Sequence, residues 1–167
     1  PGLAQIHFVP FRYRSGDDAS CLNLYAPLEP RVLGAPHSFV EVGRFSFQDS
    51  VPSGASREGN PWRLLESDFA DGSIPAIGDA NTIRYILHLS LGSMVTVRGD
   101  GGAPVRLRLV AELRDSILQG ELVISEANFL RVFAQSEGFR FFLLDAPPAA
   151  AESLIQPLMK GLADWGF

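Results

Sequence analysis

The chain of 167 residues has very few of the side chains on which many catalytic and metal sites depend. It contains one cysteine, Cys21, and three histidines, His7, His37 and His88. A single cysteine excludes an internal disulfide and a zinc site built from several thiolates. The histidines are far apart and form no HExxH pattern. The sequence therefore predicts no metal site.

Long apolar runs and an excess of positive charge are also missing. The longest unbroken run of large aliphatic and aromatic residues, FFLL at 141–144, is far shorter than the roughly 20 residues of a membrane-spanning helix. Thirteen arginines and Lys160 are outnumbered by acidic residues, so the net charge is −5. Nucleic-acid binding needs a basic surface, and we expect no nucleic acid as a partner.

No nucleophile or phosphate-binding loop has a recognisable setting. There is no Gly-x-Ser-x-Gly motif, and no spacing pairs Cys21 with a histidine base. The glycine-rich segment 99–102 lacks Gly-Lys-Ser/Thr and is predicted to be a turn between two strands. A hydrolase that uses Cys21 or an aspartate stays open as a minor alternative. We expect no catalytic residue, no metal and no cofactor in this domain.

What the sequence does contain is an alternation of short strands and helices typical of an α+β domain with a mixed sheet. Loops are expected at 26–36 and 48–61, where proline, glycine and serine are frequent. Helices are expected at 61–66 after the cap Asn60, after the cap Asp79, from the cap Ser125 to Phe133, and as an amphipathic segment at 149–165. Strands are expected at 5–14, 21–25, 40–47, 74–77, 94–97, 105–113, 122–124 and 139–144.

Aromatic residues are frequent in the loop-rich first half of the chain. We expect most of them in the core, and a minority in an exposed patch that meets a partner or an apolar substrate. The candidates for partner contact are Trp62, Phe45 and Phe47, together with the loop 48–61, because exposed loops often carry function.

Several strings resemble the periplasmic domain of bacterial FtsX-like ABC transporter permeases, the MacB-like periplasmic core domain. They cover residues 16–24 (GDDASCLNL), 74–83 (IPAIGDANTI), 120–133 and 138–142 (GFRFF). The resemblance implies one extracytoplasmic domain over 1–167 with two lobes. A smaller β-rich lobe would lie at about 79–113, and a βαβ-type lobe would combine 120–167 with the N-terminal strands.

The resemblance also implies what the parent protein does. Membrane-spanning segments would flank the domain at the periplasmic face of the bacterial inner membrane, and ATP would bind only to a separate cytoplasmic ATPase. The domain would couple ATP-driven motion in the membrane to substrate export or to regulation of a periplasmic protein or lipoprotein partner. The alternative is a free-standing periplasmic module that binds a small ligand or lipid, which the aromatic first half favours.

Overall fold

A computed structural model describes residues 7–16, 30–52, 59–145, 157 and 159–160. The chain divides into two compact units, Pro1–Val9 with Phe142–Phe167, and Pro10–Phe141. Within the described ranges, no helix combines the length and the apolar content that a membrane span requires. The expected pair of lobes, 79–113 and 120–167 with the N-terminal strands, stays a prediction.

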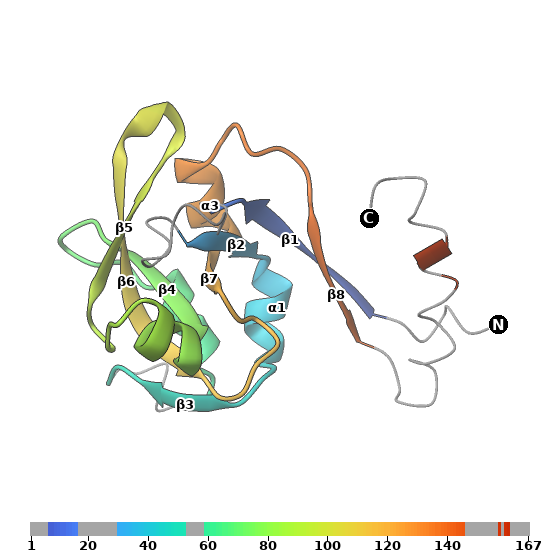
Figure 1. The fold of residues 1–167 in the computed structure, drawn as a ribbon, viewed down its shortest axis with the longest axis horizontal. Coiled ribbons are helices and arrows are strands. Elements are labelled where there is room, and N and C mark those ends of the chain that lie inside the picture. Colours follow the sequence, from blue (N-terminus) through green and yellow to red (C-terminus); the bar gives the residue numbers. More distant parts are fainter. Residues whose placement is uncertain (1–6, 17–29, 53–58, 146–156, 158, 161–167) are drawn as a thin grey trace. The chain divides into compact units, whose positions relative to one another are not determined.

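The predicted α+β class is confirmed by one mixed sheet of eight strands (Figure 1). The strand order is β3-β6-β4-β7-β2-β1-β8, and β5 pairs with β6. β2 runs parallel to β7 and β4 parallel to β6, whereas β1/β2, β3/β6, β4/β7 and β5/β6 are antiparallel. The strands are β1 (His7–Arg14), β2 (Arg31–Ala35), β3 (Phe47–Ser50), β4 (Ile74–Asp79), β5 (Met94–Arg98), β6 (Pro104–Leu113), β7 (Glu121–Ser125) and β8 (Phe141–Asp145).

The helices among the described residues are short, and two begin at caps that the sequence predicts. The Asn60 side chain accepts a hydrogen bond from the Trp62 amide, and the Ser125 side chain accepts one from the Asn128 amide. The predicted helix after Asp79 is a single π-helical turn. The helices are α1 (His37–Val42), η2 (Pro61–Glu66), η3 (Thr82–Ile86), η4 (Asp100–Gly102) and α3 (Glu126–Val132).

Helices α1 and α3 cover opposite faces of the sheet. Successive side chains of a strand point to opposite faces. In β1, Phe11 meets Phe39 of α1, with ring centroids 5.0 Å apart, whereas Arg12 pairs with Glu126 at the start of α3. Gly34 lies opposite Arg12, and a Cβ there would come within 2.8 Å of Phe129 Cβ in α3. Gly34 therefore lets α3 approach the sheet closely.

The two faces have different cores. The face under α3, here called the aliphatic face, carries a continuous buried cluster of Val32, Ile74, Ala76, Ile83, Val95, Val97, Leu107, Leu109, Leu122, Ile124, Phe129 and Phe133. The face under α1 and η2, here called the aromatic face, carries the ring cluster Phe11, Phe39, Phe45, Phe47 and Trp62. Burial of these large side chains is the main source of stability.

Two predictions for the first half of the chain are wrong. Residues 31–35, assigned to the loop 26–36, form β2, and residues 37–42, which overlap the strand expected at 40–47, form α1. β2 lies between β1 and β7 and is buried from Val32 to Ala35, so its apolar residues do not alternate with polar ones. Gly43 then ends α1 in the left-handed conformation, at φ 67°.

The other differences concern borders and exposure. The loop expected at 48–61 begins with strand β3, and 53–58 lie outside the described residues. The strand expected at 139–144 begins two residues later as β8, in which Phe142 and Leu144 are 42% and 43% exposed. The strand predicted at 21–25 lies outside the described residues. So does nearly all of the helix predicted at 149–165, of which Pro157, Met159 and Lys160 are helical.

Candidate functional site

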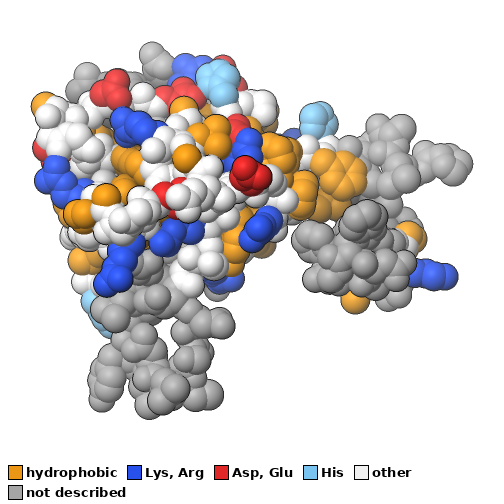
Figure 2. All heavy atoms as spheres, turned by 90° about the horizontal axis from the view of Figure 1, so that it is seen from above, with side chains coloured by type: hydrophobic (Ala, Val, Ile, Leu, Met, Phe, Trp, Pro, Cys, Tyr) orange, Lys and Arg blue, Asp and Glu red, His pale blue; other side chains and the backbone are white. Residues whose placement is uncertain are grey.

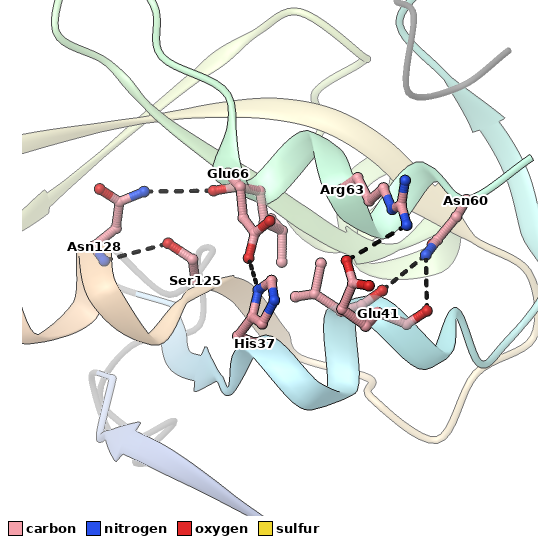
Figure 3. A network of polar contacts seen from close by, with 9 residues as sticks. His37, Glu41, Asn60, Arg63, Glu66, Ser125 and Asn128 are labelled. Carbon is pink, nitrogen blue, oxygen red and sulfur yellow. Dashed lines mark hydrogen bonds and ion pairs between the residues drawn. The ribbon is translucent and has the colours of Figure 1, made fainter. Parts of the chain in front are cut away.

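A hollow of about 530 Å³ opens at the carboxyl ends of the parallel strands β2 and β7. In α/β sheets, ligands commonly bind just outside the carboxyl ends of parallel strands. The hollow lies between α1, η2 and α3, whose polar side chains are drawn in Figure 3. Its lining consists of Ala35, His37, Glu66, Asp68, Ser125, Glu126, Ala127, Asn128 and Leu130.

Local sequence determines how each helix starts at this edge. Pro36 follows β2 in an extended conformation and its carbonyl accepts from the amides of Phe39 and Val40, which begins α1. Ser125 ends β7 and caps α3, with 3.3 Å between its Oγ and the Asn128 amide nitrogen. The Ser125 hydroxyl thus acts as a helix cap, and no described base is bonded to it.

His37 and Glu66 form the shortest side-chain contact of the hollow. Their Nδ1 and Oε1 atoms are 2.6 Å apart, and the side chains are 71% and 38% exposed. The hydrogen bond to Glu66 and the charge of that carboxylate raise the pKa of His37, and Glu41 adds a smaller effect in the same direction. Partial burial and Arg63 oppose the rise of this pKa.

Further polar contacts hold η2 against both neighbouring helices (Figure 3). The side-chain amide of Asn60 donates through Nδ2 to the carbonyl oxygens of Val40, at 2.8 Å, and of Glu41, at 3.5 Å. Arg63 pairs with the Glu41 carboxylate at 3.5 Å. On the side of α3, the side-chain amide of Asn128 donates through Nδ2 to the Leu65 carbonyl at 3.5 Å. The position of η2 therefore depends on several single polar contacts as well as on the packing of Trp62.

The lining is acidic. It carries the carboxylates Glu66, Asp68 and Glu126 and the titratable His37. Glu126 is neutralised in part by Arg12, whose Nε lies 2.9 Å from its Oε1. Among the described residues, no group of His, Cys, Asp and Glu side chains has an arrangement that holds a metal ion. The hollow can accept hydrogen bonds from a donor or cation, and its charge changes when His37 titrates.

The residues predicted to contact a partner lie on the aromatic face, away from the lining of the hollow. Trp62 is fully buried, its indole N–H donates to the Arg44 carbonyl, and its ring meets Phe39 at 4.8 Å. Phe45 and Phe47 are half-buried, with centroids 6.3 and 5.5 Å from the Trp62 ring. All three rings thus pack together. Their contact with a partner stays a prediction.

The cysteine and the aspartates that a hydrolase could use as candidates, Cys21, Asp17, Asp18, Asp68 and Asp71, have separate settings. Cys21, Asp17 and Asp18 lie outside the described residues. Asp71 accepts hydrogen bonds from Ser73 and from Arg108, and these partners lower the pKa of Asp71 to about 2. Asp71 therefore joins the segment before β4 to β6. Of these candidates only Asp68 lines the hollow.

Sequence reasoning missed the hollow itself. It identified His37 only as an isolated imidazole and Ser125 only as a cap, and it did not single out Glu126 or Asn128. All four residues lie at the carboxyl end of a strand or within three residues after it, which is a usable signal. That signal needs the parallel pairing of residues 31–35 with 121–125, and no local pattern predicts that pairing.

The surface seen in Figure 2 mixes the side-chain types. Basic, acidic and hydrophobic side chains are interspersed there, and the Lys and Arg side chains form no continuous basic patch on this face.

Comparison with known proteins gives one similar structure. No family model matches the chain, and no curated protein matches it. The periplasmic region of MacB from Actinobacillus actinomycetemcomitans is similar, with 13% sequence identity and a TM-score of 0.45. The match covers 93% of this chain and 66% of that one, so the chain spans just under two thirds of the length of the solved structure. That structure comes from the group of domains that the sequence strings resemble.

Proposed function

We propose that this chain is the extracytoplasmic domain of an ABC transporter permease, located at the periplasmic face of the bacterial inner membrane. In this role it transmits ATP-driven motion from the membrane to substrate export or to a periplasmic protein or lipoprotein partner. The ATPase is a separate cytoplasmic component. The domain itself is not catalytic.

The observation that carries the proposal is the pairing of the first and last described strands. β1 and β8 are hydrogen-bonded neighbours in the sheet, and Figure 1 draws the beginning of β1 beside the end of β8. The stretches His7–Val9 and Phe142–Asp145 belong to one compact unit. A domain inserted between two membrane segments needs its entry and exit close together, and this ribbon supplies that geometry.

The family-like strings support the same proposal from the sequence side. The string 74–83 covers β4 and runs into η3, and the string 120–133 covers β7 and α3. Both β4 and β7 are buried along their whole length. The similarity therefore concerns the central strands of the sheet, which is where a shared fold leaves its strongest pattern.

The location of the domain is tested by thiol labelling of the full-length protein in its own membrane. Cysteine is placed at the exposed position Ser90 in a Cys21→Ala background. We expect a membrane-impermeant maleimide to label Ser90→Cys in intact cells with a permeabilised outer membrane. The Cys21→Ala protein is the unlabelled control. Labelling of Ser90→Cys that appears only after the inner membrane is lysed would refute the extracytoplasmic location.

The coupling role is tested by weakening the two strands that join the units. Gly-Gly is inserted after Val9 in β1 and after Phe141 in β8 of the full-length transporter. We expect ATP hydrolysis to persist while the transport or partner response is lost. The matched control carries the same insertion in the turn η4, between β5 and β6. Unchanged coupling with both strands interrupted would contradict a mechanical role.

The alternative, a module that binds a lipid or another apolar ligand, is less well supported by the described residues. The buried aromatic rings pack against one another, and the lining of the hollow contains three carboxylates. An acyl-chain pocket is mostly apolar. Displacement of a fluorescent fatty acid from the isolated protein tests this alternative, and saturable uptake would favour it.

A further inference from the structure

The contacts that join α1 to η2 differ in how they respond to pH. Asn60 donates to backbone oxygens and does not titrate. Arg63 pairs with the Glu41 carboxylate, and neither partner is an imidazole. His37 is the group in this set whose charge changes near neutral pH.

The titratable pair also has a distinct place. His37 is the first residue of α1 and Glu66 is the last residue of η2, and both line the hollow. The Asn60 contacts lie at the other end, because Asn60 precedes η2 and bonds to Val40 and Glu41 late in α1. The start of α1 therefore faces the end of η2 at the edge of the hollow.

We infer that the His37–Glu66 contact is a pH-controlled latch between α1 and η2 at the mouth of the hollow. The latch is closed when His37 is protonated and pairs with the Glu66 carboxylate. Loss of the proton removes the charge attraction and leaves Glu66 held by at most a neutral hydrogen bond from Nδ1. The contact is then weaker, and the hollow becomes more acidic by one charge. The Asn60 and Arg63–Glu41 contacts keep the far end of η2 in place.

The net influence of the groups around His37 is to raise its pKa. Glu66 and Glu41 favour the imidazolium and Arg63 disfavours it. Across the hollow, α3 presents Glu126, which is held by Arg12, and Asp68 follows η2. The folded-state pKa of His37 is raised, so the latch is fully present below the ordinary pKa of about 6.5 and is lost as pH rises through the raised value.

An NMR titration of the imidazole protons in the chain tests the latch. The chain has three histidines, so the resonances are first assigned with a His37→Gln variant. We expect the His37 midpoint to lie above the ordinary value of about 6.5 and to fall in Glu66→Gln. Glu41→Gln, which removes a neighbouring carboxylate of the same size, should lower it less. A His37 midpoint that Glu66→Gln leaves unchanged would overturn the proposal.

Hydrogen exchange tests whether weakening of the His37–Glu66 contact also loosens the end of η2. The Ser67 amide, which bonds to the Leu64 carbonyl at the end of η2, reports on this edge, and the Gly99 amide in the distant turn is the reference. We expect the Ser67/Gly99 exchange ratio to rise a few fold as pH passes the His37 midpoint, and to be pH-independent in Glu66→Gln. A Ser67/Gly99 exchange ratio that stays constant with pH in the wild-type protein would refute the latch.

Discussion

The two faces of the sheet are held by different kinds of interaction. The aliphatic face is a continuous apolar cluster under α3, with Phe129 and Phe133 fully buried. The aromatic face has a smaller set of rings around Trp62, and its outer elements α1 and η2 are joined by the Phe39–Trp62 ring contact and by single polar contacts. Dispersion and burial are insensitive to pH, whereas the polar contacts depend on charge and geometry.

This difference shows where the molecule has room for a response. A close-packed apolar cluster resists small displacements, so the aliphatic face supplies a rigid base for β2 and β7. The hollow opens at the ends of these two strands, but α1 and η2, which form part of its rim, belong to the aromatic face. Experiments that perturb each face separately test this difference.

Removing one large ring from each face has the largest expected effect. Phe129→Ala and Trp62→Ala should each lower the free energy of unfolding by about 3–5 kcal/mol, because both side chains are fully buried. Urea unfolding followed by far-UV circular dichroism is the measurement, since Trp62 is one of two tryptophans and its loss alters fluorescence. A Trp62→Ala cost under about 1 kcal/mol, the size of an average point mutation, would show that the aromatic face is peripheral to folding.

A single added methyl group should be harmful where α3 approaches β2. The new Cβ in Gly34→Ala would lie 2.8 Å from Phe129 Cβ and 2.9 Å from Arg12 Cβ, atoms that no side-chain rotation can move away. We expect a loss of about 1–3 kcal/mol in the free energy of unfolding.

Gly78→Ala is the matched control for this substitution. Its Cβ would meet the flexible end of Leu122, at 2.9 Å from Cδ2, so the cost should be smaller than for Gly34→Ala. Equal costs from thermal unfolding of the two variants would contradict the role assigned to Gly34.

Loss of either helix cap should lower the free energy of unfolding moderately, and by more for η2 on the aromatic face than for α3. Ser125→Ala removes one acceptor at the start of α3 and should cost about 1 kcal/mol. Asn60→Ala also removes the bond to Val40, so its cost should approach about 2 kcal/mol. Chemical unfolding measures both, and Ser125→Thr, which keeps the acceptor, should be nearly neutral.

The smallest expected effect is the acid dependence contributed by Asp71. Its pKa is lowered to about 2 by Ser73 and Arg108, so its stabilising contribution is present above the ordinary value of about 4 and is lost as pH falls toward 2. The effect is small because the group is exposed. The difference in Tm between wild type and Asp71→Asn should shrink between these pH values. Asp68→Asn, which removes the same charge nearby in the sequence, controls for the change in net charge.

The second half of the sheet could be predicted from the sequence because its patterns are local. Strands β5 and β6 alternate or run apolar between clear turns, and Ser125 precedes α3 as a typical cap. Residues 31–42 were assigned wrongly because their state depends on neighbours. The short run RVLGA becomes a strand only when β1 and β7 flank it, and α1 forms only when Phe39 packs on Trp62 and Phe11.

The α+β class, the strands β4 and β7, the helix caps and the acidic balance of charge could be read from the sequence, because they follow from periodicity, composition and the chemistry of single residues. The parallel pairing of β2 with β7, which brings His37 and Glu66 together with Ser125 and Asn128 around one hollow, is visible only in the folded chain. The physical reason is that pairing between distant strands is chosen by burial and shape over the whole sheet, and no short segment contains that information.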